Sequence, residues 1–133
     1  MLFVPKGFRN KEELLNAYLN FLKDNCPEKV CYISGPISQK NGNTVEENIR
    51  NLNRYAAELN ASGKYNVVID PSAVGDLEAM GYSREDALYV WTSLLSSGLV
   101  GVIAMIPGWE HSDGATIEHE TAIKHRLKIV YLK

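Results

Sequence analysis

Two glutamates stand two residues apart near the end of the chain, in a segment whose pattern predicts a helix. At about 100° of rotation per residue, Glu118 shares one side of that helix with Ala115 and Ala122. Glu120 lies elsewhere around the helix, four residues before Lys124, which is a favourable spacing for an exposed ion pair. A carboxylate on a face of small residues needs partners when it is buried, and at the mouth of a crevice it is a candidate nucleophile or base. Glu118 is therefore the candidate for chemistry, and Glu120 belongs to the surface.

The segment before this helix contains small and polar residues that suit a ligand contact. Gly114, near the helix start, leaves free backbone N–H groups that favour an anion. Ser112 or Asp113 could instead serve simply as the N-cap of the helix. Trp109, in a loop flanked by glycine, is a candidate wall for a flat nucleobase, although it also suits a core position. The three histidines show no zinc-binding spacing, so we expect no metal site.

A second candidate segment is the sequence SGPIS, which runs from Ser34 to Ser38 directly after an apolar run. The Gly35-Pro36 turn and the residue after it, Ile37, would let backbone N–H groups and hydroxyls approach a phosphate or a sugar. The spacing matches neither the Rossmann glycine fingerprint nor a P-loop, so no nicotinamide or nucleoside-triphosphate motif is present. An ordinary turn between a strand and a helix remains an equal alternative for this segment.

Alternating helices and strands must position these residues. Capping residues and hydrophobic spacing predict helices over residues 10–26, 44–62, 83–97 and 114–125. Short apolar runs predict strands over residues 29–34, 65–70, 99–106 and 127–132. Residues 35–43 are rich in turn formers and are expected to form a loop.

This order predicts an α/β fold with a parallel sheet covered on both faces. We expect a small doubly wound, flavodoxin- or Rossmann-like three-layer sandwich with about four to five strands and an added N-terminal helix. Ligands of such folds bind beyond the carboxyl ends of the strands. The loops that begin near Ser34, at Asp70 and at Pro107 should therefore converge on one crevice.

Composition narrows the function classes. With 133 residues, 45% of them hydrophobic, the chain suits one domain over residues 1–133. The net charge is −2 with mixed signs, so we expect no nucleic-acid polymer as partner. The longest apolar stretch, Leu99–Ile106, is too short to span a bilayer, so no membrane partner is expected. The first residues lack a secretory pattern and the two cysteines, Cys26 and Cys31, suit reduced thiols, which favours a cytoplasmic protein.

With these motifs assembled, the chain resembles the nucleoside 2-deoxyribosyltransferase-like family over residues 29–131. The likeness begins at YISGPI, residues 32–37, and continues through Asn48, VVIDP at residues 67–71, and Tyr89. Its most specific part is MIPGWEHSDGATIE, which ends at Glu118. Residues 1–28 lie outside the likeness and are expected to form an N-terminal helical extension.

The resemblance implies cleavage of the N-glycosidic bond of 2′-deoxynucleosides or their 5′-monophosphates, without a cofactor. Glu118 takes the place of the nucleophile, which forms a covalent deoxyribosyl-enzyme that another base or water resolves. Tyr32 is expected to orient Glu118, and Gly35, Pro36 and Gly114 to supply close backbone contacts. Ser112 stands where relatives contact the sugar or a 5′-phosphate, and a serine there favours a monophosphate. Members of the family assemble, so we expect at least a homodimer.

One departure from the family concerns the proton donor to the leaving base. The family has an aspartate on the third helix and another at the start of the third strand, where this chain has Ser93 and Gly101. A serine is too weak an acid for that step. Asp86 or Tyr89, on the same helical face as Ser93, could replace the acid, or Asp86 could simply belong to the helix cap.

Two other functions stay open at this point. The loss of the family's aspartate is compatible with a nucleotide-binding protein that senses or sequesters its ligand without catalysis. A flavodoxin-like interaction domain is a further alternative, although Glu118 on a face of small residues argues against it.

Overall fold

The structure is a computed structural model that describes residues 1–38 and 42–133. Residues 39–41, within the predicted loop 35–43, lie outside the described residues. The helices are α1 (Lys11–Leu22), α2 (Val45–Ala61), α3 (Arg84–Leu95) and α4 (Asp113–Lys124), with short 3₁₀ turns η1 (Pro27–Lys29), η3 (Pro71–Val74) and η4 (Trp109–His111). The strands are β1 (Val30–Ser34), β2 (Val67–Ile69), β3 (Val102–Met105) and β4 (Lys128–Tyr131). The predicted alternation of helices and strands is confirmed.

The helices begin where their capping side chains place them. Thr44 and Glu47 form the reciprocal capping box that the sequence predicts at the start of α2. The Ser83 side chain accepts a hydrogen bond from the Asp86 N–H at 3.0 Å at the start of α3. At α4, the Ser112 side chain accepts from the Ala115 N–H at 3.2 Å, so Ser112 is the N-cap. These caps fix the helix starts that reach the carboxyl end of the sheet.

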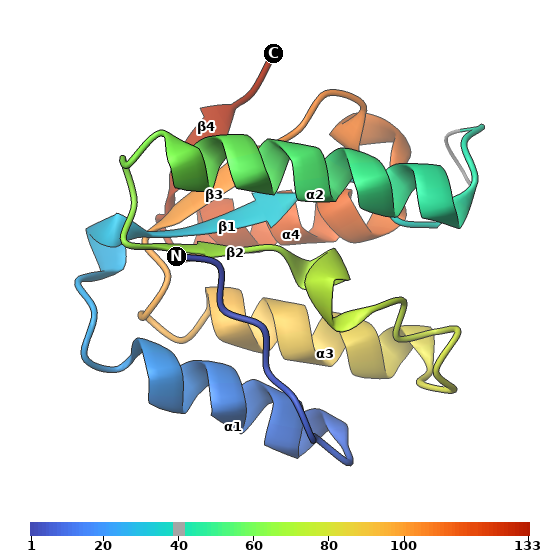
Figure 1. The fold of residues 1–133 in the computed structure, drawn as a ribbon, viewed down its shortest axis with the longest axis horizontal. Coiled ribbons are helices and arrows are strands. Elements are labelled where there is room, and N and C mark those ends of the chain that lie inside the picture. The colour runs from blue at the N-terminus through green and yellow to red at the C-terminus, as the bar shows by residue number, and fades with distance from the viewer. Residues whose placement is uncertain (39–41) are drawn as a thin grey trace.

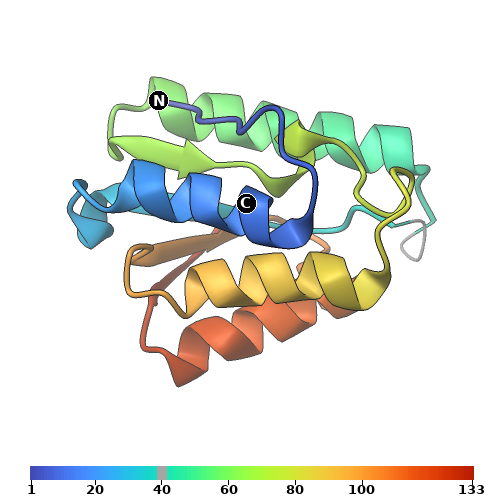
Figure 2. The same cartoon turned by 90° about the horizontal axis from the view of Figure 1, so that it is seen from below.

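The four strands form one parallel sheet in the order β2-β1-β3-β4. Helix α2 lies along one face of the sheet, while α1 and α3 lie along the other (Figure 1). Viewed from below, α4 packs beside α3 (Figure 2). After β2 the chain crosses back past β1 and adds β3 on the other side of it. Because crossover connections are right-handed, this change of direction places helices on both faces of the sheet. The predicted small doubly wound α/β fold is therefore present, with four strands.

The larger core lies on the face that carries α1, α3 and α4. Leu14, Tyr18 and Leu22 of α1 are fully buried in it, and the Tyr18 ring makes an edge contact with Trp91 of α3 at 5.8 Å between ring centroids. Leu2 also pairs with Val68 beside the β2 edge of the sheet. The N-terminal segment is thus packed into the same core as the rest of the chain.

The residue before β3 lies very close to the turn before β1. At the amino end of β3, a Cβ on Gly101 would overlap the backbone carbonyl of Pro27, and the Gly101 N–H donates to that carbonyl at 2.9 Å. This close approach explains a glycine at position 101.

Within residues 1–38 and 42–133, no helix combines the length and the apolar character that crossing a membrane requires.

Candidate active site

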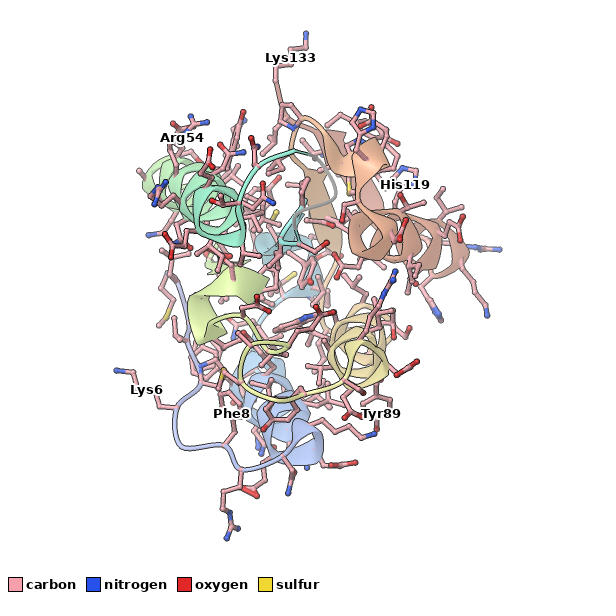
Figure 3. All side chains as sticks on the ribbon, turned by 90° about the vertical axis from the view of Figure 1, so that its right-hand side faces the viewer. Lys6, Phe8, Arg54, Tyr89, His119 and Lys133 are labelled. Atoms are coloured by element: carbon pink, nitrogen blue, oxygen red, sulfur yellow. The ribbon has the colours of Figure 1, made fainter. Side chains whose placement is uncertain are left out.

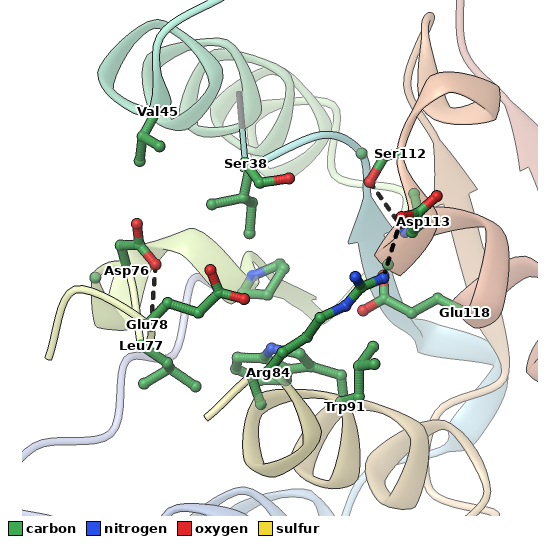
Figure 4. Close-up of a pocket in the computed structure, with 18 residues that line it drawn as sticks. Ser38, Val45, Asp76, Leu77, Glu78, Arg84, Trp91, Ser112, Asp113 and Glu118 are labelled. Carbon is green, nitrogen blue, oxygen red and sulfur yellow. Dashed lines mark hydrogen bonds and ion pairs between the residues drawn. The ribbon is translucent and has the colours of Figure 1, made fainter. Parts of the chain in front are cut away.

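A cavity of about 280 Å³ opens at the carboxyl end of the sheet. Its walls come from the turns that follow β1 and β2, from the first two turns of α3 and from the start of α4 (Figure 4). These segments are far apart in the sequence and meet because parallel strands end at the same edge. The crevice that the sequence predicts at this edge is therefore present.

Glu118 of α4 lies in the wall of this cavity with only 6% of its surface exposed. The Tyr32 hydroxyl donates to its Oε2 at 2.9 Å, and the Ser34 hydroxyl donates to its Oε1 at 2.6 Å. Tyr32 and Ser34 are two residues apart on β1, so their side chains project from the same face of the strand. One strand therefore holds both oxygens of the carboxylate in a fixed orientation.

The surroundings of Glu118 change its acidity. Burial raises the pKa of Glu118 to about 7, and the hydrogen bonds from Ser34 and Tyr32 offset part of that increase. Burial, together with the charge of Glu118, raises the pKa of Tyr32 well above its usual value. Tyr32 therefore stays a hydrogen-bond donor, while Glu118 is present in both protonation states near neutral pH.

Backbone packing brings the turn after β1 close to the cavity. A Cβ on Gly35 would overlap Cγ1 and Cδ1 of the buried Ile106 side chain. Beyond this turn, the Asn48 side chain of α2 donates to the carbonyl oxygens of Ser38 at 2.8 Å and Ile37 at 3.2 Å. Through Asn48, helix α2 thus holds the backbone of two residues that line the cavity.

An ion pair joins the two helix starts at the cavity. The Arg84 Nη2 lies 3.3 Å from Asp113 Oδ2, and both side chains remain about half exposed. Figure 4 shows the Arg84 side chain extending from α3 past Glu118 toward Asp113. In the part of the chain that the structure describes, no group of three or more His, Cys, Asp or Glu side chains is arranged to hold a metal ion.

Residues 29–131, which include all the strands and the whole cavity wall, match a protein family described as a domain of unknown function (DUF4406). The chain belongs to this family. No curated protein and no solved structure matches the chain. The family match thus covers the candidate site, and the description of the family names no activity.

Several of the predicted site residues come together in the cavity. Tyr32 donates a hydrogen bond to Glu118, and the predicted residues that line the cavity are Gly35, Ile37, Ser112, Gly114 and Glu118. Glu120 is exposed, as its position on the helix predicts. Pro36 is buried beside the cavity without lining it. The sequence therefore located the nucleophile candidate and the two loops on either side of it.

Asp86, Tyr89 and Ser93 share one face of α3, as predicted, but none of them lines the cavity. Asp86 instead pairs with Lys11 of α1 at 2.9 Å, and the Lys11 ammonium lies 4.9 Å from the centre of the Tyr89 ring. In Figure 3, Tyr89 lies on the outer side of α3. The cavity receives the opposite face of α3, which carries Leu88 and Trp91. We therefore do not retain Asp86 or Tyr89 as the acid.

Two further predicted residues have structural roles outside the cavity lining. Trp109 stacks on His119 with ring centroids 4.3 Å apart, while the tryptophan that lines the cavity is Trp91. Asp70 is buried, and its side chain accepts from the N–H of Ser72 at 2.9 Å at the start of η3. Trp91 therefore replaces Trp109 as the candidate surface for a flat base.

Sequence reasoning missed three contributors to the site. Ser34 could have been found from its spacing, because a residue two positions after Tyr32 on a strand faces the same way. Trp91 could have been found from the apolar face of α3, which must point into the molecule. Arg84 carried no comparable signal, since its partner Asp113 is distant in the sequence and only the packing of α3 on α4 joins them.

Proposed function

We propose that the chain cleaves the N-glycosidic bond of 2′-deoxynucleosides or their 5′-monophosphates, with Glu118 as the nucleophile. The observation that carries the proposal is a buried carboxylate in a cavity wall, held by two hydroxyl donors at 2.9 and 2.6 Å. The cavity, at about 280 Å³, is close to the roughly 300 Å³ at the lower end of small-molecule sites. The resemblance to nucleoside 2-deoxyribosyltransferase-like proteins supports the same assignment for Glu118.

In the first step, a carboxylate oxygen of Glu118 bonds to C1′ of the deoxyribose while the bond between C1′ and the base nitrogen breaks. The bonding electrons leave with the base, which takes up one proton. A carboxylate placed against the sugar also stabilises the positive charge that develops at C1′. A second base or a water molecule then attacks C1′, loses a proton and releases Glu118 as the free carboxylate.

Tyr32 and Ser34 would serve this reaction by keeping Glu118 oriented and ionised. Each hydroxyl donates to a different oxygen, which favours the charged form and lowers the pKa that burial raises. The carboxylate still has free lone pairs for attack, because each of its oxygens accepts more than one contact. Attack requires the ionised form, so the rate should increase as the pH rises through about 7.

The proton for the leaving base needs a source other than Asp86 or Tyr89. Asp76 and Glu78 are acidic side chains that line the same cavity as Glu118, so they take over as candidates, whereas Asp113 is paired with Arg84. Figure 4 shows the Glu78 side chain reaching from its loop into the cavity.

We also propose that the chain forms a homo-oligomer, as members of the resembled family do.

The proposal is tested by incubating the protein with a panel of deoxynucleosides and their 5′-monophosphates, with and without an added acceptor base. Chromatography then measures free and exchanged base. Wild type should release base, the Glu118→Gln variant should lose at least about a hundredfold in rate, and Glu120→Gln should match wild type because Glu120 is exposed on the same helix. Tight binding without base release from any substrate would contradict the enzyme and support the ligand-binding alternative.

A further inference from the structure

The position of Glu118 limits where a proton donor to the leaving base can lie. A nucleophile displaces a leaving group from the opposite side of the carbon atom, so the base lies on the side of C1′ away from Glu118. The group that protonates the base must lie on that side too, within hydrogen-bond reach of the base. Asp113 does not meet this condition, because it begins the helix that carries Glu118 and is paired with Arg84 at 3.3 Å.

The cavity wall across from α4 comes from the loop between η3 and α3. This loop contributes residues 75–78 to the cavity lining. In the view of Figure 4, the side chains of Glu78 and Glu118 enter the cavity from different sides. A flat base that stacks on Trp91, which lines the same cavity, would have Glu118 on one side and Glu78 on the other.

The backbone on both sides of Glu78 is held in place, while its carboxyl group is not engaged. Leu77 is only 5% exposed and packs in the larger core, and its carbonyl accepts from the Tyr82 N–H at 3.0 Å. The Asp76 side chain accepts from the Glu78 N–H at 3.1 Å, so it serves the turn of the loop. Within residues 1–38 and 42–133, the Glu78 carboxyl group has no hydrogen-bond or ion-pair partner. Of the two acidic residues on this loop, Glu78 is therefore the one with a carboxyl group available for a ligand.

Resting on the function proposed above, we propose that Glu78 is the residue that protonates the leaving base. The carboxyl group of Glu78 gives its proton to a ring nitrogen or a carbonyl oxygen of the base as the bond from C1′ to the base breaks, and Glu78 is left as a carboxylate. In the second step this carboxylate takes the proton that the attacking water or incoming base loses, which returns Glu78 to its starting form. The bound base excludes water, and the negative charge of Glu118 lies in the same cavity; both favour a protonated carboxyl group across from it.

The test compares the rates of base release from paired substrates that differ in how readily the base leaves. The pairs are 2′-deoxyuridine with 5-fluoro-2′-deoxyuridine and 2′-deoxyadenosine with its 2-fluoro analogue, because an electron-withdrawing fluorine lets a base leave with less help from a proton. Glu78→Gln should slow release from the unsubstituted substrate by at least about a hundredfold. The loss for the fluorinated substrate should be smaller by at least about threefold.

Sodium azide tests the second step in the same variant. Azide attacks C1′ of the deoxyribosyl-enzyme without losing a proton, so it does not need the carboxylate of Glu78. With the fluorinated substrate, azide should increase the turnover of Glu78→Gln by at least about threefold and leave wild type unchanged. A residue with only a structural role would not give this rescue.

Two further variants serve as comparisons. Glu85→Gln removes one negative charge from the first turn of α3, outside the cavity lining, and should match wild type. Asp76→Asn keeps an oxygen that can accept from the Glu78 N–H, so its loss of rate should be smaller than that of Glu78→Gln.

Wild-type rates in Glu78→Gln would overturn the inference, while base release that depends on Glu118 would keep the proposed function. An equal loss for both members of each pair, without rescue by azide, would give Glu78 a structural role and overturn the inference as well. A larger loss in Asp76→Asn than in Glu78→Gln would move the acid to Asp76 and would also overturn it. No base release by wild type from any substrate would instead reject the proposed function, and the inference with it.

Discussion

At the scale of single residues, the side chain of Glu118 experiences two opposing effects. Burial disfavours its ionised form, while the hydroxyls of Tyr32 and Ser34 stabilise that form, and the pKa that results is about 7. A carboxylate with this pKa is less stabilised by water than an exposed one, which makes it a better nucleophile. The same burial should make the stability of the fold depend on pH.

The Glu118→Gln variant tests that dependence. The pKa of Glu118 is raised from 4.5 to about 7 in the folded chain, so the stabilisation from its protonated form is full below pH 4.5 and is lost as pH rises through about 7. Relative to the variant, the free energy of unfolding of wild type should fall by up to about 3 kcal/mol over this range. Urea denaturation at a series of pH values measures it, with Glu120→Gln as the control. Parallel curves for wild type and Glu118→Gln would contradict the assignment.

Residue patterns predicted the separation of Glu118 from Glu120, because the phase of a helix depends only on local geometry. They left two roles open for Asp86, and the structure shows the one at the Ser83 cap, while Asp86 and Tyr89 lie on a face of α3 outside the cavity lining. The direction of this face depends on α1, whose Lys11 pairs with Asp86 from a distant part of the sequence. Whether Trp109 forms a wall of the cavity was also not predictable from local pattern, because its ring stacks on His119 of α4 and lies outside the cavity lining.

At the scale of elements, the turn after β1 closely approaches the residue that follows β3. Gly35 makes this possible, because its missing Cβ leaves space for Ile106, which directly follows β3 and is fully buried. Gly114 at the start of α4 is different, since a Cβ there would come no closer than 4.0 Å to the Ser112 hydroxyl. Only the first glycine is required by packing.

Alanine substitutions of the two glycines should therefore behave differently. Gly35→Ala should destabilise the fold by about 1–3 kcal/mol, because Ile106 must move within a packed core. Gly114→Ala should leave stability unchanged or raise it by about 0.5–1 kcal/mol, because alanine is the better helix former. Urea denaturation of both variants measures the difference. Equal stability of Gly35→Ala and wild type would contradict the close approach of this turn to β3.

At the scale of the whole molecule, the alternation of apolar strands and amphipathic helices predicted the parallel sheet and the edge where the cavity lies. The capping residues Thr44 and Ser83 and the apolar runs act within their own segments, so the helices and strands that they predict are present in the fold. The composition of the cavity wall is a property of the assembled fold. Arg84 and Trp91 line the same cavity as Glu118 because α3 packs on α4.

The central claim is that Glu118 forms a covalent bond to the sugar, and mass spectrometry of the protein's peptides tests it most directly. Wild type is mixed with a deoxynucleoside from which it releases base, quenched in acid, digested and mapped. The peptide that contains Glu118 should gain the mass of one deoxyribosyl group, and Glu118→Gln should gain none. Base release without any adduct, or an adduct on a residue other than Glu118, would contradict the account.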